Sequence, residues 1–120
     1  MKAMVTEVGA HALDGKEAML ILFGEGATES LREYSVIQAF EDKTKITVKK
    51  GDRVKIDDAV YTVEQVGSFA NANLNSIAHV TLVFAPVPDE DPVVNGLYLS
   101  PTIYPTLQVG STIEYLLEGE

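Results

Sequence analysis

The sequence predicts an all-β protein, a small β-barrel made of two similar β-units with one or two short helices. Three observations support this. Short runs rich in Val, Ile, Leu, Thr and Tyr recur along the 120 residues, with Gly, Pro, Asn and Asp between them. Helical periodicity is weak. The first half of the chain also resembles the second at a nearly constant spacing, which is typical of an internal repeat.

The predicted strands follow one another along almost the whole chain. The pair Asp57-Asp58 between two of them is typical of a tight hairpin turn. The runs are MVTEV (4–8), AMLILF (18–23), YSVIQAF (34–40), KITVKK (45–50), DRVKI (52–56), VYTVEQV (60–66), HVTLVF (79–84), LYLS (97–100) and STIEYLL (111–117).

Two segments favour short helices. TESLRE (28–33) offers Thr28 as the N-cap and Glu29 in the first turn, where an acidic side chain is favourable. SFANANLNSI (68–77) places apolar side chains at near-helical spacing behind Ser68 as a cap. Its asparagines weaken this second prediction, because their amides compete with the helical backbone.

Three ordered matches define the internal repeat. VTEVG (5–9) matches VEQVG (63–67), MLILF (19–23) matches VTLVF (80–84), and VKKGDRVKI (48–56) matches LQVGSTIEY (107–115), at offsets of 58, 61 and 59 residues. These matches predict β-units at about 5–56 and 63–115. Neither unit has enough strands to bury its apolar face alone, so we expect both to close on one core. The whole chain, 1–120, is therefore predicted to be a single domain.

Composition narrows the classes of function. A hydrophobic content of 46% supports a real core, and the absence of cysteine excludes disulfides and thiolate chemistry. No apolar run approaches the roughly 20 residues of a membrane-spanning helix, and the start lacks the apolar core of a signal peptide. We therefore expect a cytoplasmic protein without membrane insertion. A net charge of −9 argues against nucleic-acid binding.

The cationic residues are unevenly distributed. Six of the nine fall between positions 43 and 55, namely Lys43, Lys45, Lys49, Lys50, Arg53 and Lys55. One interpretation is a solvated edge strand, since edge strands often carry lysine. The other is a local surface for an anionic partner.

The residues available for chemistry are few. His11 and His79 are the only histidines, too few for an all-histidine zinc site. FGEGATES (23–30) lacks the lysine of a phosphate loop, no GxSxG is present, and PDEDP (88–92) is interpreted as a solvated loop. The sequence thus predicts neither a metal nor a cofactor. His11 is expected to be exposed in a turn, and His79 either caps or packs through a backbone hydrogen bond or belongs to a site.

One polar side chain interrupts an apolar face. In EYSVIQAF (33–40), the alternation of a strand places Tyr34, Val36, Gln38 and Phe40 on the same side. Gln38 is the only one of the four without an apolar or aromatic side chain. An amide among core residues needs hydrogen-bond partners, so its position calls for a specific explanation.

Four longer segments lie between about Val5 and Leu116, namely MLILFGEGATESLREYSVI (19–37), VKKGDRVKI (48–56), YTVEQVGSFANANLNSIAHVTLVF (61–84) and LQVGSTIEY (107–115). Together they show a resemblance to the glucitol/sorbitol-specific IIA component of the bacterial phosphoenolpyruvate-dependent sugar phosphotransferase system. This resemblance implies a cytoplasmic β-barrel that accepts a phosphoryl group from the histidine-containing phosphocarrier protein and passes it to the IIB domain of a sugar permease.

The same resemblance gives Gln38 a meaning. The family strand typically ends in Tyr-Cys-Val/Phe-Ile-His, and its histidine is the phosphorylated residue. Here the matching stretch is YSVIQ, with Ser35 in the place of the cysteine and Gln38 in the place of the histidine. The lone pair of an amide nitrogen is delocalised into the carbonyl, so Gln38 is not a nucleophile. His79 aligns with a histidine usual in the family and is the fallback acceptor, whereas His11 has no counterpart.

Three functions remain open from the sequence. The chain is a IIA-type component with transfer altered or lost at Gln38 and a docking or regulatory role, or an active phosphocarrier that uses another histidine. The alternative is a small-molecule or protein-binding β-barrel without phosphotransfer, since a fold does not fix a function. Whether the chain is a phosphotransferase enzyme is therefore left undecided. A homodimer through unpaired strand edges is also considered.

Overall fold

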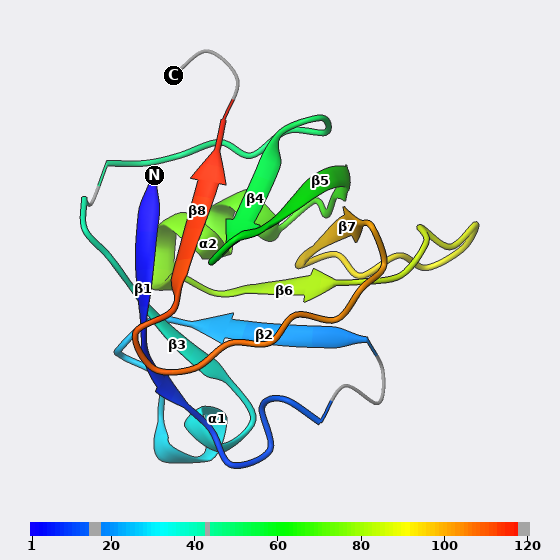
Figure 1. Cartoon of the computed structure of the whole chain (residues 1–120). Coiled ribbons are helices and arrows are strands. Elements are labelled where there is room, and N and C mark those ends of the chain that lie inside the picture. The colour runs from blue at the N-terminus through cyan, green and yellow to red at the C-terminus, as the bar shows by residue number, and fades with distance from the viewer. Residues whose placement is uncertain (15–17, 43, 118–120) are drawn as a thin grey trace.

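A computed structural model describes residues 1–14, 18–42 and 44–117 and shows a closed barrel with two short helices (Figure 1). The predicted fold class is therefore confirmed. The strands are β1 (Lys2–Val8), β2 (Met19–Phe23), β3 (Val36–Phe40), β4 (Arg53–Ile56), β5 (Ala59–Val66), β6 (Val80–Val83), β7 (Gly96–Ser100) and β8 (Thr112–Leu116). The helices are α1 (Glu29–Glu33) and α2 (Ala70–Ile77).

The strands follow the order β1-β3-β2-β6-β7-β5-β4-β8, and β8 pairs again with β1. The pairs β2·β3 and β6·β7 are parallel, and the other six are antiparallel. Closure pairs every strand of the described residues on both sides, so none of these strands has the open edge that an unclosed sheet would expose. The argument for a homodimer through such edges is therefore lost.

The two halves of the barrel are related by an approximate two-fold exchange. Replacing β1–β4 by β5–β8 reproduces the same ring of strands. The Gly51 amide donates to the carbonyl of Val63 at 2.8 Å, and the Gly110 amide donates to the carbonyl of Val5 at 2.9 Å. Both glycines have a positive φ, +96° and +95°, which glycine adopts without the strain of a side chain. These equivalences match the offsets of 58 and 59 residues.

Around β2 and β6, structurally equivalent residues are 60 positions apart, whereas the sequence match has an offset of 61. Before these strands, Ala18 and Ala78 are equivalent, and both have positive φ, 56° and 54°. After the strands, the Gly24 amide donates to the carbonyl of Ile77 at 2.9 Å and the Phe84 amide donates to that of Ala18 at 2.8 Å. Gly24 is thus the counterpart of Phe84, whereas the sequence match pairs Phe23 with Phe84.

The predicted strand at 45–50 is wrong, because this segment pairs with side chains and not with a neighbouring strand. We call residues Thr44–Lys49 the strap. The amide side chain of Asn75 accepts from the Ile46 N–H at 2.8 Å and donates to the Ile46 carbonyl at 2.7 Å. Asn71 does the same for Val48, at 2.8 and 3.0 Å.

The spacing of the two asparagines explains this arrangement. Four residues of helix rise about 6 Å, and two residues of extended chain span about 6.6 Å. Asn71 and Asn75, one turn apart on α2, therefore meet alternate residues of the strap. Ile46 and Val48 are buried between them and the core. The asparagines that weaken the helix as isolated sequence thus hold a neighbouring segment in place.

The turns and caps agree in part with the predictions. The hairpin turn at Asp57-Asp58 is confirmed, because Ile56 pairs with Ala59 across it. Thr28 is the N-cap of α1, although its side chain makes no capping bond, whereas α2 is capped at Phe69 and the predicted Ser68 cap is wrong. Over the described ranges, neither helix has the length and apolar character to cross a membrane.

Candidate functional site

A pocket of about 620 Å³ opens at one end of the barrel. Its wall is formed by the loop after β2, the end of β3, the start of the strap and the last turn of α2. The residues that line it include Met1, Gly24, Glu25, Ala27, Gln38, Asp42 and Ala78. The pocket therefore lies where the strand carrying Gln38 ends.

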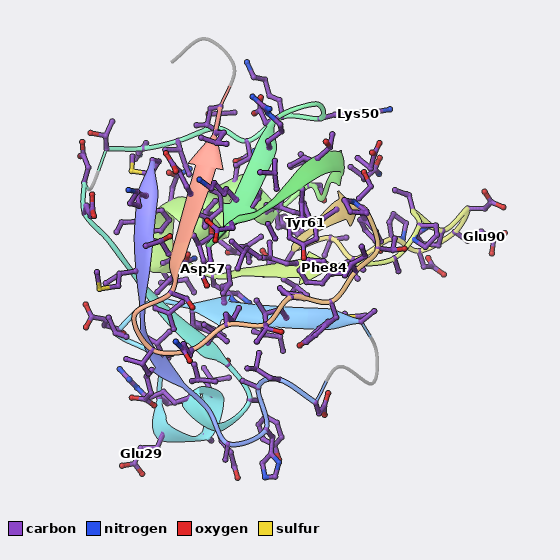
Figure 2. The ribbon with its side chains drawn as sticks, in the orientation of Figure 1. Glu29, Lys50, Asp57, Tyr61, Phe84 and Glu90 are labelled. Atoms are coloured by element: carbon purple, nitrogen blue, oxygen red, sulfur yellow. The ribbon has the colours of Figure 1, made fainter. Side chains whose placement is uncertain are left out.

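The barrel has this opening at one end because the two units differ in side-chain size. Phe84, the counterpart of Gly24, is 2% exposed. Its ring lies 5.1 Å from that of Tyr61 and 5.5 Å from that of Tyr104, both in edge-on geometry. Figure 2 shows Tyr61 and Phe84 close together inside the barrel. An aromatic cluster thus fills the region that a glycine leaves open in the other unit.

Gln38 lies on the inner face of β3, beside the pocket, and 1% of its surface is exposed. Its Nε2 donates to the Ala78 carbonyl at 3.0 Å, and its Oε1 accepts from the Tyr115 hydroxyl at 2.9 Å. Both ends of the amide are therefore satisfied, as burial requires. This answers how an amide is accommodated between Val36 and Phe40.

The hydrogen bond between Gln38 and Tyr115 joins the two units, and the symmetry-related position has no polar pair of this kind. Gln38 pairs with Val5 across the sheet, and its counterpart Leu99 pairs with Val63. Tyr115 corresponds to Ile56 at the offset of the repeat. Leu99 and Ile56 are buried and apolar. Two polar side chains thus replace two apolar ones, with Gln38 at the wall of the pocket and Tyr115 buried behind it.

The role of Tyr115 was not predicted from the sequence. A signal was present, because the repeat aligns its phenol with an aliphatic side chain. Complete burial raises the pKa of the Tyr115 hydroxyl, and its hydrogen bond to Gln38 offsets this only in part. The hydroxyl therefore remains a proton donor toward Gln38 throughout the neutral range.

We expect the phenol of Tyr115 to stay un-ionised until the barrel unfolds in alkali. Because its pKa is raised in the folded state, the unfolded chain releases this proton at a lower pH than the folded chain. The contribution of Tyr115 to stability is therefore fully present below about pH 10 and is lost as pH rises further. Phenolate absorbance and far-ultraviolet circular dichroism, followed together during an alkaline titration, measure this. In Tyr115→Phe, one tyrosine fewer is expected to ionise in the transition that coincides with unfolding. If the variant instead lacks one of the tyrosines that ionise before unfolding, the assignment is contradicted.

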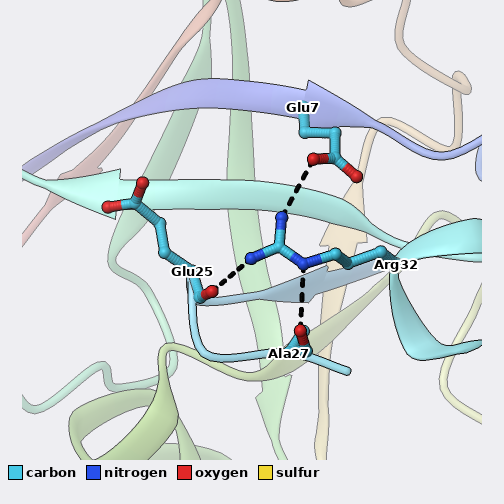
Figure 3. Close-up of polar contacts among 4 residues, drawn as sticks. All are labelled: Glu7, Glu25, Ala27 and Arg32. Atoms are coloured by element: carbon cyan, nitrogen blue, oxygen red, sulfur yellow. Dashed lines mark hydrogen bonds and ion pairs between the residues drawn. The ribbon is translucent and has the colours of Figure 1, made fainter. Parts of the chain in front are cut away.

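Arg32 holds the loop that forms one wall of the pocket (Figure 3). Its Nε donates to the Ala27 carbonyl at 2.9 Å, its Nη2 donates to the Glu25 carbonyl, and its Nη1 contacts the Glu7 carboxylate at 2.9 Å. One guanidinium on α1 thus connects β1 with the loop after β2. Its three directed donors fix this loop better than a single ammonium would.

The charges at the pocket are mainly negative. Glu25 and Asp42 contribute carboxylates and Met1 contributes the N-terminal ammonium, and no Lys, Arg or His side chain is among the described residues that line it. Hydrogen bonds from the Thr44 hydroxyl and amide lower the pKa of Asp42, which keeps that carboxyl ionised. Within the described part of the chain, the cation at this pocket is therefore the Met1 ammonium and not a Lys, Arg or His side chain.

Comparison with known proteins identifies relatives of this barrel. A family model described as PTS system glucitol/sorbitol-specific IIA component matches residues 1–114. The chain belongs to this family. The crystal structure of a PTS system IIA component from Enterococcus faecalis V583 is 51% identical, with a TM-score of 0.94, and the alignment covers 98% of this chain and all of that one.

Two further relatives of the IIA family match over a shorter span. The PTS system glucitol/sorbitol-specific EIIA component of Escherichia coli (strain K12) is 38% identical over 81 residues, which is 67% of this chain and 65% of the relative. The protein of the same name from Shigella flexneri has the same identity and coverage. The aligned part thus spans slightly less than two thirds of either relative.

Neither histidine of this IIA family member is hydrogen-bonded to the Gln38 amide, although His79 directly follows Ala78, whose carbonyl accepts from Gln38. The His79 ring stacks on Phe23, with centroids 3.8 Å apart, and its Nδ1 lies 2.9 Å from the Leu22 carbonyl. Because a carbonyl only accepts, Nδ1 carries the proton and Nε2 keeps its lone pair. His11 is largely exposed in a turn, 3.5 Å from the Glu33 carboxylate.

Proposed function

We propose that this member of the glucitol/sorbitol-specific IIA family docks with the components of the sugar phosphotransferase system but does not carry a phosphoryl group at position 38. Its partners are the histidine-containing phosphocarrier protein and the permease IIB domain, and its place is the cytoplasm. Its role is regulatory, because it occupies the docking surface of a partner without accepting or passing on a phosphoryl group. The observation that carries the proposal is the state of the Gln38 amide, which is buried with both polar ends bonded.

The chemistry of the side chain supports the loss of transfer. A phosphoryl acceptor needs a nitrogen lone pair that can attack phosphorus in line with the leaving group. The Nε2 of Gln38 is an amide nitrogen, and its N–H is directed at the Ala78 carbonyl. The remaining machinery of such a site acts by positioning, which does not replace a nucleophile.

The surroundings of Gln38 support the same conclusion. Glu25 and Asp42 line the pocket without a cationic side chain among its described residues. A phosphoryl group is strongly anionic, and neighbouring carboxylates raise its energy unless cations compensate. A phosphoryl group at position 38 would therefore add negative charge beside two carboxylates, which disfavours transfer to this position.

A second candidate function uses His79. Its Nε2 has a lone pair while Nδ1–H donates to the Leu22 carbonyl, an arrangement that orients an imidazole for attack. In this step Nε2 bonds to the phosphorus of the donor's phosphohistidine, and the donor's N–P bond breaks with its electron pair left on that nitrogen. The chain would then be an active phosphocarrier through a residue outside the pocket.

The test is phosphorylation of the wild-type chain. It is mixed with phosphoenolpyruvate, enzyme I and the phosphocarrier protein, and its intact mass is measured in alkali, where phosphohistidine survives. We expect no adduct, together with binding of the phosphocarrier protein in a titration calorimeter. If the wild-type chain gains an adduct and His79→Gln does not, the second candidate function is established. Absence of both adduct and binding would favour a β-barrel that binds other proteins or small molecules without phosphotransfer.

A further inference from the structure

We propose that the outer edge of the strap binds an extended acidic peptide segment of a partner protein as an added β-strand. The proposal concerns a surface that the Gln38 site does not use. It also assigns a role to the cluster of cations that the sequence shows between positions 43 and 55. Lys43 itself lies outside the described residues and is not part of the surface.

The backbone of the strap is paired on one side only. Ile46 and Val48 direct their N–H and C=O groups at the asparagine side chains of α2. In an extended chain the groups of intervening residues point the opposite way. These belong to Lys45 and Thr47, and neither residue takes part in a hydrogen bond with any other described residue. The strap therefore presents a short unpaired β-edge on the surface of a closed barrel.

The ends of this edge are well defined. At Lys49 the backbone turns, because its N–H donates to the Asp52 carboxylate at 2.8 Å and its carbonyl accepts from the Asp52 N–H at 3.0 Å. At the other end, Thr44 is fixed by the Asp42 carboxylate. Contacts at both ends thus hold the strap in place, so a peptide strand would not have to order it before binding.

Charge selects the class of partner. Lys45, Thr47 and Lys49 are exposed and alternate with the buried Ile46 and Val48. Side chains two residues apart in a strand lie on the same face, about 6.6 Å from one another. A peptide with Asp or Glu at every second position would oppose these lysines across the new strand pair, a favourable cross-strand arrangement.

The position of the edge adds a consequence for the pocket. Lys50 extends into solvent beyond the end of the strap, where more cationic side chains follow on β4 (Figure 2). Asp42, Thr44 and Ile46 belong both to this stretch of chain and to the lining of the pocket. The edge therefore belongs to a segment that also forms part of the pocket wall.

The experiment uses the whole chain and a blocked eight-residue peptide that alternates glutamate with valine. Amide hydrogen exchange is followed by nuclear magnetic resonance. Saturation with peptide is expected to slow exchange of the Lys45 and Thr47 amides by at least about tenfold, the effect of 1.4 kcal/mol of protection. The same peptide with glutamine for glutamate is expected to bind more weakly, and added salt should weaken the acidic peptide further.

Two variants separate strand addition from charge attraction. Lys45→Glu is expected to weaken binding clearly more than Lys2→Glu, which changes the net charge equally outside the strap. Thr47→Pro keeps every charge and removes a donor that has no internal partner, so it is expected to abolish the protection of Lys45. Unchanged affinity of Thr47→Pro would overturn the proposal, as would absence of binding to wild type. Equal binding of an eight-residue oligothymidylate would show a general polyanion surface and would also overturn it.

Discussion

Gln38→His is expected to gain one phosphoryl group from the phosphocarrier protein, whereas the wild-type chain gains none. An imidazole reaches about as far from the backbone as a glutamine side chain and supplies both a donor and an acceptor. It can therefore keep the hydrogen bond to the Ala78 carbonyl that Nε2 now makes. Its second nitrogen would replace Oε1 as the acceptor from Tyr115, and rotation of the ring away from that hydroxyl would free its lone pair to attack phosphorus. Intact mass in alkali measures the adduct, and its loss in acid identifies phosphohistidine.

The controls for this variant locate the adduct and test the access. Gln38→Leu removes the amide without adding a nucleophile and should remain unlabelled. Gln38→His combined with His79→Gln should be labelled as strongly as Gln38→His alone. Because 1% of the Gln38 surface is exposed, docking must move a neighbouring side chain before transfer. If Gln38→His binds the phosphocarrier protein and still gains no adduct, position 38 is closed to the donor and the proposed equivalence with a phosphohistidine fails.

Much of the fold follows from the sequence because its determinants are local. Strand composition, the hairpin turn at Asp57-Asp58 and the positive-φ glycines at positions 51 and 110 lie within a few residues of the elements they define. The repeat then supplied the architecture, since neither unit has enough strands for a core of its own. Family resemblance indicated Gln38 as the position of interest, and the structure places it at a pocket.

The features that the sequence did not reveal depend on contacts between distant residues. The strap reads as a strand by composition, but its partners are Asn71 and Asn75, more than 20 residues away. The pocket lies where Gly24 stands in one unit and Phe84 stands at the equivalent position of the other. A shift of one residue in the repeat alignment conceals this equivalence. Tyr115 was missed because its partner is 77 residues away. Such contacts become visible only when the barrel closes.

Tyr115→Phe is expected to lower the free energy of unfolding by about 1–3 kcal/mol, because it leaves the buried Oε1 of Gln38 without a donor. Gln38→Leu is expected to cost a similar amount, since it strands the buried Tyr115 hydroxyl. Tyr61→Phe is the matched control. It also removes a phenolic hydroxyl, but the partner is the carbonyl of Ile103, a residue that is 64% exposed and that water can satisfy.

The double variant Gln38→Leu, Tyr115→Phe is expected to recover most of the loss, to within about 1 kcal/mol of wild type, because an apolar pair leaves no buried polar group unpaired. The symmetry-related position already shows that this barrel accepts apolar side chains there, with Leu99 and Ile56 as the equivalent buried residues. Urea unfolding of the four chains gives the coupling energy. Costs that add without recovery would mean that the two side chains act independently. Recovery would mean that folding does not require the polar pair, and that the buried Gln38 amide at the pocket wall does not serve stability.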